Sequence, residues 1–106
     1  MYKFFVYSPD DSEVINKIIV AASEAGAGKI GNYENCAFII KGHGTWLPIP
    51  GAKPVDGEIG QLSIEPEVKI EMECPKEKME AVFMAIREVH PYEKIAIDAV
   101  TIERFE

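Results

Sequence analysis

The chain has 106 residues, about the length of one domain, and its 47% hydrophobic and 27% charged residues are typical of a folded globular protein. Its formal net charge is −7 and its Lys and Arg residues are scattered singly, so we expect no nucleic-acid partner and no attraction to an anionic membrane. With two cysteines, no signal-peptide pattern and no apolar run long enough to cross a bilayer, it is predicted to be a cytoplasmic protein with a single domain over residues 1–106.

The N-terminal part of the chain predicts a strand followed by a helix. Residues 3–8 (KFFVYS) are aromatic and β-branched and stop at a proline, which is typical of a strand. The sequence Ser-Pro-Asp-Asp at 8–11 predicts a helix start with Ser8 as its cap. An apolar stripe with helical period follows over residues 14–22, and Gly26 is expected to end the helix.

Gly26, Gly28 and Gly31 are spaced like the G-x-G-x-x-G loop of dinucleotide-binding proteins. In that loop the glycines follow a strand and open a helix, because N–H groups at the helix N-terminus hold the phosphate. Here they follow the predicted helix and lead into residues 35–41 (NCAFIIK), an apolar run that predicts a strand. The order is reversed, so we interpret the glycines as a helix end and a tight turn.

Residues 42–60 contain five of the eight glycines and three of the seven prolines, which predicts a long irregular loop in which no regular strand runs far. A loop of this length in a small domain is usually functional or forms an interface. It holds the only tryptophan, Trp46, beside other apolar residues. We expect this apolar group to pack on its own domain or on a neighbouring subunit, with a small-molecule cleft as a third possibility.

The C-terminal half predicts a strand, a helix and a final strand. Residues 62–75 alternate between apolar and charged side chains, which is typical of a strand with one buried face. Apolar residues at helical spacing over 79–86 predict a helix that ends at His90, and residues 94–103 predict the last strand. The order β-α-β-β-α-β predicts an α+β, ferredoxin-like sandwich with a four-stranded antiparallel sheet and two helices on one face.

The face of this sheet without helices is expected to carry apolar surface. The strands at 3–8 and 35–41 have apolar residues on both sides, so covering one face leaves others exposed. Self-association into a dimer or trimer is the simplest way to cover them, and a protein partner is the alternative.

Three stretches of the chain are specific in combination: residues 24–54 (EAGAGKIGNYENCAFIIKGHGTWLPIPGAKP), 57–62 (GEIGQL) and 90–98 (HPYEKIAID). With them, almost the whole chain closely resembles the inserted domain of the NGG-one-interacting factor three-like proteins, whose larger members are predicted dinuclear-metal hydrolases. That inserted domain is similar in fold to the CutA and nitrogen-regulatory P-two proteins, which assemble into trimers.

The resemblance implies a role without catalysis. The metal ligands of the larger proteins lie in flanking domains, which 106 residues cannot hold as well. The expected protein is therefore an accessory module that binds or regulates, and the GTP cyclohydrolase label of some larger relatives is not transferred to it. The chain departs from the family's pattern at His43 and at Lys94.

Cys36, His43 and His90 are the side chains best suited to hold a divalent metal, with Glu93 and Asp98 as further candidates. They lie far apart in sequence, without the spacing of a zinc motif, so a site would form only if folding brought them together. The alternative is structural: Cys36 as a small core residue, His43 as a loop residue and His90 near the end of the second helix.

An interaction site is predicted where residues 42–50 and 90–93 converge on one edge, because the loop leaves the second strand and the turn follows the second helix. Its expected residues are Gly42, Gly44, Thr45, Trp46, Pro48, Pro91, Tyr92 and Glu93. No hydroxyl, thiol or amine has an adjacent base, so no catalytic residue is predicted. The hypotheses are a binding or regulatory module, a small metalloprotein, an enzyme, and a structural adaptor that binds only itself or another protein. An enzyme would need a pocket with perturbed titrating groups, and the sequence identifies none.

Overall fold

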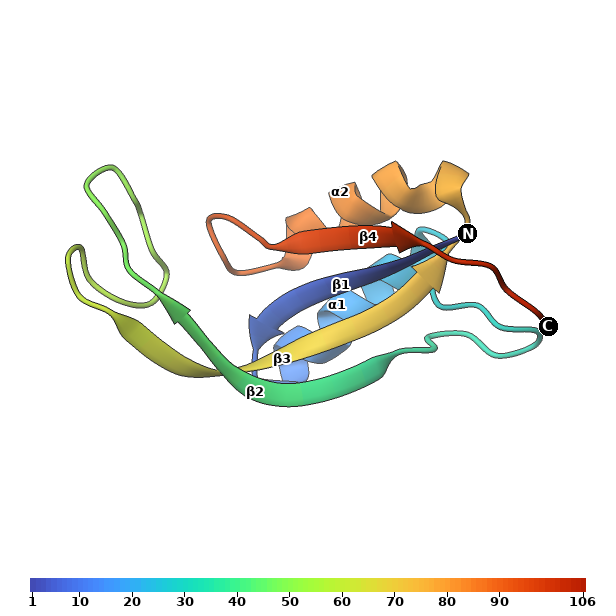
Figure 1. Ribbon diagram of the computed structural model, residues 1–106, viewed down its shortest axis with the longest axis horizontal. Coiled ribbons are helices and arrows are strands. Elements are labelled where there is room, and N and C mark those ends of the chain that lie inside the picture. The colour runs from blue at the N-terminus through green and yellow to red at the C-terminus, as the bar shows by residue number, and fades with distance from the viewer.

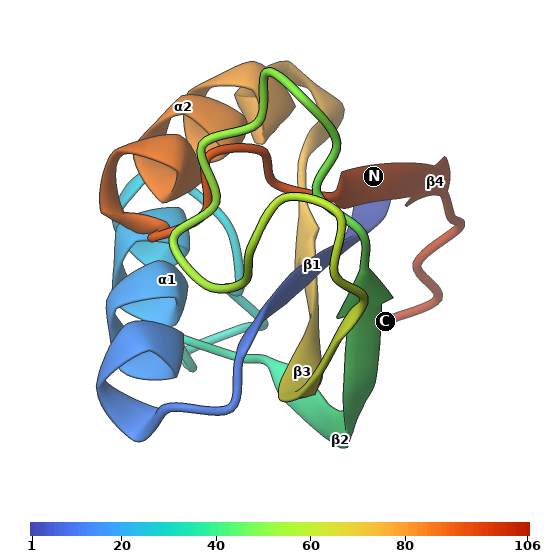
Figure 2. The ribbon, with the colours of Figure 1, turned by 90° about the vertical axis from the view of Figure 1, so that its left-hand side faces the viewer.

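The computed structural model describes residues 1–106, and its elements follow the order β-α-β-β-α-β (Figure 1). They are β1 (Tyr2–Pro9), α1 (Ser12–Glu24), β2 (Phe38–Trp46), β3 (Ser63–Cys74), a 3₁₀ turn (Lys76–Lys78), α2 (Met79–Val89) and β4 (Ile97–Thr101). The antiparallel sheet has the order β2-β3-β1-β4, and both helices cover one of its faces (Figure 2). The predicted ferredoxin-like fold is confirmed.

The core lies between the sheet and the two helices. Alternate residues of β1 and β3 point toward the helices, as the alternation over 62–75 predicts, and the apolar stripes of α1 and α2 meet them. The buried cluster consists of Phe4, Val6, Ile18, Ala22, Ala27, Val68, Ile70, Met72, Cys74, Val82 and Ile86.

Helix α1 begins later than the sequence predicts, because Asp11 caps it and Ser8 does not. The Oδ1 atom of Asp11 accepts hydrogen bonds from the backbone N–H groups of Glu13 (2.9 Å) and Val14 (3.1 Å). Ser8 is buried within β1, and its hydroxyl donates to the carbonyl of Pro9. A carboxylate cap also stabilises the positive end of the helix dipole, which a serine does not.

Strand β2 begins and ends later than predicted. It pairs with β3 from Phe38 opposite Glu71 to Trp46 opposite Ser63, so residues 42–46, expected to be irregular, are part of the sheet. Glycine disfavours a strand, but an available partner strand supplies the backbone hydrogen bonds. The irregular loop therefore covers residues 47–62 and not 42–60.

Beyond the end of β1, strands β2 and β3 continue as a two-stranded arm (Figure 1). Residue Pro9 at the end of β1 pairs with Glu67, so residues 63–65 of β3 pair with β2 alone. The molecule is elongated, with extents of 47 × 23 × 22 Å. The loop 47–62 at the tip of the arm folds back toward the turn between α2 and β4 (Figure 2).

The sheet face opposite the helices exposes apolar side chains. Phe38 is 66% exposed, Ile40 42% and Val100 48%. Charged residues of β3 lie between them, and the ammonium group of Lys69 sits 4.4 Å from the centre of the Phe5 ring. The apolar surface that the sequence predicts on this face is therefore present, in a mixed apolar and charged setting.

The start of β1 and the residue that follows β4 lie side by side, because the backbone N–H of Ile102 donates to the carbonyl of Met1 (3.0 Å). Neither helix has the length and apolar character needed to cross a membrane.

Candidate functional site

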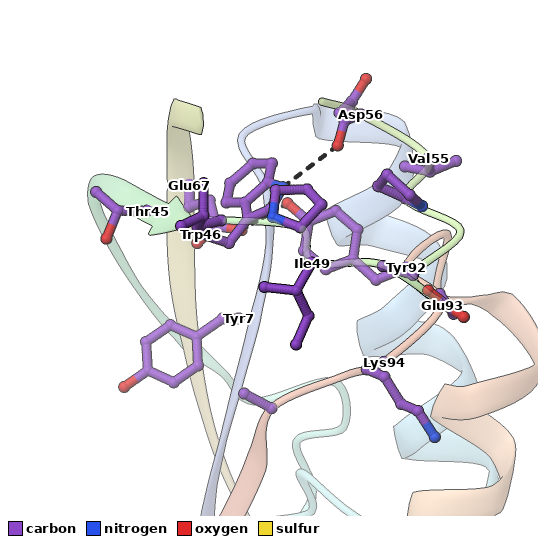
Figure 3. A pocket seen from close by; sticks show the side chains of 15 residues that line it. Tyr7, Thr45, Trp46, Ile49, Val55, Asp56, Glu67, Tyr92, Glu93 and Lys94 are labelled. Atoms are coloured by element: carbon purple, nitrogen blue, oxygen red, sulfur yellow. Dashed lines mark hydrogen bonds between the residues drawn. The ribbon is translucent and has the colours of Figure 1, made fainter. Parts of the chain in front are cut away.

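A pocket of about 400 Å³ lies where the loop 47–62 meets the turn after α2 (Figure 3). Strand β1 contributes Tyr7, strand β3 contributes Glu67, and the other lining residues fall within 45–56 and 92–96. The pocket is built from segments far apart in sequence, at the edge where the sequence predicts that loop and turn converge.

Trp46, the last residue of β2, fixes the loop to its own domain. Its indole Nε1–H donates to the backbone carbonyl of Asp56 (3.3 Å), which closes the loop onto the residue from which it leaves. Its ring lies 6.1 Å from the ring of Tyr92, centre to centre, with the planes inclined at 49°. Of the possibilities open from the sequence, Trp46 packs within its own chain and lines a cleft.

Tyr92 connects the turn to the sheet. Its hydroxyl donates to Oε2 of Glu67 (2.5 Å), a charge-assisted hydrogen bond across 25 positions of sequence. Burial raises the pKa of the Tyr92 hydroxyl, and the Glu67 carboxylate raises it further. The hydroxyl therefore keeps its proton at neutral pH and acts as a donor.

Glu67 can reach Tyr92 because Gly44, on the neighbouring strand, has no side chain. A Cβ atom at Gly44 would overlap the carboxylate of Glu67, whereas one at Gly42 would meet open space. The alternation over residues 62–75 predicts that Glu67 faces solvent, and no local pattern indicates this role. The pairing of Gly44 with Glu65, and so the diagonal position of Glu67, depends on a register that the sequence does not encode locally.

His90 holds the turn against β1. Its Nδ1 accepts the backbone N–H of Tyr92 (3.1 Å), so the ring proton sits on Nε2 and is donated to the carbonyl of Tyr7 (2.7 Å). The side chain is 8% exposed, and burial lowers the pKa of the His90 imidazole, which favours the neutral ring. Both ring nitrogens are engaged, so neither offers a free lone pair to a metal.

The predicted metal ligands do not come together. No group of three or more His, Cys, Asp or Glu side chains in this chain is arranged to hold a metal ion. His43 is exposed on β2, whereas Cys36 precedes that strand, and the stretch from Phe38 to His43 alone spans about 16 Å. Asp98 lies on β4, opposite Phe5. Within a single chain, folding therefore does not meet the condition stated for a metal site, and the candidate ligands stay apart.

Most of the predicted interaction residues do come together. Those that line the pocket are Thr45, Trp46, Pro48, Tyr92 and Glu93. Gly42, Gly44 and Pro91 do not line it, although Gly44 admits Glu67. Glu93 also binds the loop directly, because its Oε1 accepts the backbone N–H of Lys53 (2.8 Å).

Almost the whole chain aligns in sequence with segments of curated relatives. It is 41% identical over 102 residues to a GTP cyclohydrolase 1 type 2 homolog of Bacillus subtilis (strain 168), covering 96% of this chain and 27% of that protein. A homolog of the same description from Mycobacterium leprae (strain TN) is 38% identical over 96 residues, covering 91% and 24%. The chain thus spans about a quarter of the length of these relatives. No family model matches it.

A solved structure shows how far the likeness extends. The Bacillus cereus protein related to NIF3 superposes on 97% of this chain with a TM-score of 0.81 and 34% sequence identity, over 26% of its own length. This chain is therefore similar to one segment of that protein. The finding supports the resemblance to the NGG-one-interacting factor three-like proteins.

CutA proteins share the fold of this chain. CutA from Archaeoglobus fulgidus, described as a periplasmic divalent cation tolerance protein, matches 100% of the chain with a TM-score of 0.70 at 18% identity and over 88% of its own length. CutA1 from Pyrococcus horikoshii matches 100% of the chain with a TM-score of 0.66 at 16% identity and over 87% of its length. The predicted CutA-like architecture is confirmed.

Proposed function

We propose that this NIF3-related chain is a non-catalytic, self-associating module that binds a small-molecule ligand or regulates through it. The observation that carries the proposal is the pocket of about 400 Å³ between the loop 47–62 and the turn 90–93. Volumes of this size and lining of mixed apolar and polar character are typical of small-molecule sites.

The contacts around the pocket support a binding role because they fix its shape. Tyr92 is held by Glu67, by the ring of Trp46 and by the His90 ring. Glu93 holds the loop through Lys53. A wall held in place in this way reduces the ordering that binding would otherwise require.

The chemistry of the same residues favours binding over catalysis. The Tyr92 hydroxyl is kept protonated, and the nitrogens of His90 are occupied by backbone groups. General acid–base catalysis needs a group that can exchange a proton near neutral pH within reach of a substrate. The description of the curated relatives as GTP cyclohydrolase 1 type 2 homologs belongs to proteins of which this chain spans about a quarter.

A metabolite panel screened by thermal shift and native mass spectrometry tests this function. We expect at least one small molecule to raise the melting temperature and to remain bound, unchanged, in the spectrum. Ile49→Trp should reduce its retention by filling the pocket, because Ile49 is an exposed lining residue. Ile64→Trp is the matched control, because Ile64 is similarly exposed but lies outside the pocket.

Two outcomes would contradict the proposal. If no member of the panel stabilises the protein, the pocket is not a ligand site. If a bound member is converted to a product, and Ile49→Trp abolishes the conversion, the module is an enzyme.

A further inference from the structure

The pocket has an imbalance of charge. Its lining includes the acidic residues Asp56, Glu67 and Glu93 but only one basic residue, Lys94. None of these three carboxylates forms an ion pair with a basic side chain anywhere in the structure. In the view of Figure 3 they are distributed around the Trp46 and Tyr92 rings. The site therefore presents negative charge that the protein itself leaves uncompensated.

The hydrogen bonds of these carboxylates leave oxygens available. Glu67 uses one oxygen for the Tyr92 hydroxyl, and Glu93 uses one for the N–H of Lys53. Asp56 contributes only its backbone carbonyl, to Trp46, so its carboxylate has no hydrogen bond within the protein. An ionised carboxylate accepts several hydrogen bonds, and a ligand with N–H donors can supply those that are missing.

Aromatic rings form the apolar part of the pocket. Trp46 and Tyr92 are in contact as one wall, Tyr7 also lines the cavity, and eight of the fifteen lining residues are hydrophobic. The faces of such rings attract a cation through their quadrupole, most strongly for tryptophan. The aromatic rings and the carboxylates thus both favour a positively charged ligand.

The electrostatic environment of Tyr92 also favours a positively charged ligand. After burial, the influences that raise the pKa of the Tyr92 hydroxyl are the negative charges of Glu67, Asp56 and Glu65. The whole chain adds to this field, with a net charge of −7.

We propose that the pocket selects a small organic cation, an amine, amidine or guanidine attached to a flat apolar group. The apolar group packs on Trp46 and Tyr92, and the cationic group donates hydrogen bonds to Asp56 and Glu93. This inference rests on the proposed binding function and names the class of its ligand. An anion of the nucleoside triphosphate type would meet like charge in the same place.

Benzamidine, benzamide and benzoate test the proposal, because they share one shape and carry positive, zero and negative charge. Trp46 is the only tryptophan, so its fluorescence reports binding at the site directly. At low ionic strength we expect benzamidine to bind at least tenfold more tightly than benzamide and benzoate to bind least. Raising the salt concentration should narrow the difference.

Three variants test which charged residues determine the affinity for benzamidine. Asp56→Asn keeps the shape and removes one charge, and should weaken benzamidine binding about three- to tenfold while leaving benzamide binding unchanged. Lys94→Met should strengthen benzamidine binding, since it removes the only basic lining residue. Glu103→Gln makes the same change of net charge as Asp56→Asn at an exposed position outside the pocket, and should have no effect.

The outcomes separate this inference from the function on which it rests. If benzamide or benzoate binds as tightly as benzamidine, the pocket binds ligands without selecting a cation, and only the inference is overturned. If none of the three changes Trp46 fluorescence while a neutral or anionic metabolite from the panel is retained, the inference is again overturned and the binding function stands. If Glu103→Gln weakens benzamidine as much as Asp56→Asn does, the attraction comes from net charge and not from the pocket.

Discussion

At the scale of single residues, Tyr92 makes the contacts that hold the site together. Its hydroxyl, ring and backbone N–H reach Glu67, Trp46 and His90 respectively. These contacts link the turn after α2 to the two-stranded arm and to the loop 47–62, both of which are distant from the turn in sequence. The sequence places this tyrosine in the predicted interaction site, and the structure adds its hydrogen bond to a charged group.

Removing the Tyr92 hydroxyl should destabilise the protein measurably. Tyr92→Phe leaves the ring against Trp46 but deprives Glu67 of its donor, and a hydrogen bond to a charged group contributes about 1.5–3 kcal/mol. Because the pair is only half-buried, we expect a loss of about 1–2 kcal/mol in urea-induced unfolding at neutral pH. Tyr33→Phe is the control: Tyr33 is 74% exposed and makes no side-chain hydrogen bond, so its loss should be near zero. If the two variants lost equal free energy of unfolding, the hydrogen bond to Glu67 would not contribute to stability.

His90 should make the stability depend on pH on the acid side of neutrality. Burial lowers the pKa of His90 below its ordinary value of 6.5, and outweighs the Tyr7 carbonyl and Glu67, which act in the opposite direction. The unfolded chain therefore takes up a proton before the folded protein does. Stability is complete above about pH 6.5 and falls as the pH drops below it toward the folded pKa.

Urea unfolding at about pH 7 and about pH 5.5 measures this effect. The loss of stability between the two should shrink in His90→Gln and persist in His43→Gln, because the exposed His43 ring has no hydrogen bond to lose. A pH dependence that follows His43 would show that the buried ring is not its source.

At the scale of elements, the pairing register of β2 and β3 determines whether Glu67 reaches the pocket. Gly44→Ala should push the Glu67 side chain away from Tyr92, at a cost of about 1–3 kcal/mol in stability. Gly42→Ala, on the same strand and with open space around it, should cost far less. In a Tyr92→Phe background the cost of Gly44→Ala should fall, because the bond that it disrupts is already absent. Additive losses would mean that the two sites act independently.

The elements also show which parts of the fold the sequence predicts. Residues 62–75 and 79–86 were placed correctly because alternation and helical spacing are local signals. The start of α1 was wrong because two polar groups, Ser8 and Asp11, compete to cap it within four positions. The continuation of β2 through residues 42–46 was missed because it depends on hydrogen bonds from β3, which no local pattern reports.

The same distinction holds for the site. Trp46 and Tyr92 could be predicted because Trp46 lies in a stretch rich in glycine and proline and Tyr92 in a short turn after a helix. Tyr7 and Glu67 could not, since each lies in an ordinary strand and enters the pocket only through the strand order and register. Predicting Asp56 as a lining residue would have required the hydrogen bond that folds the loop back to Trp46.

At the scale of the whole molecule, the open sheet face should drive self-association. We expect sedimentation analysis to show a dimer or trimer, because Phe38, Ile40 and Val100 leave apolar surface uncovered by the helices. Phe38→Lys should shift the equilibrium toward the monomer. Met84→Lys, at an exposed residue of α2 on the helical side, should not. A wild-type monomer at high concentration would contradict this expectation.

The hydrogen bond between Ile102 and Met1 has a consequence for how such a unit can be carried by a longer polypeptide. Neighbouring strands of a sheet are about 5 Å apart. The first residue of this fold and the residue after its last strand are therefore close neighbours in space. This fold could therefore be inserted between two adjacent positions in a surface turn of a longer host protein without separating them. The fold of that protein would not need to change at the insertion site. The relatives, of which this chain spans about a quarter, are long enough to be such hosts.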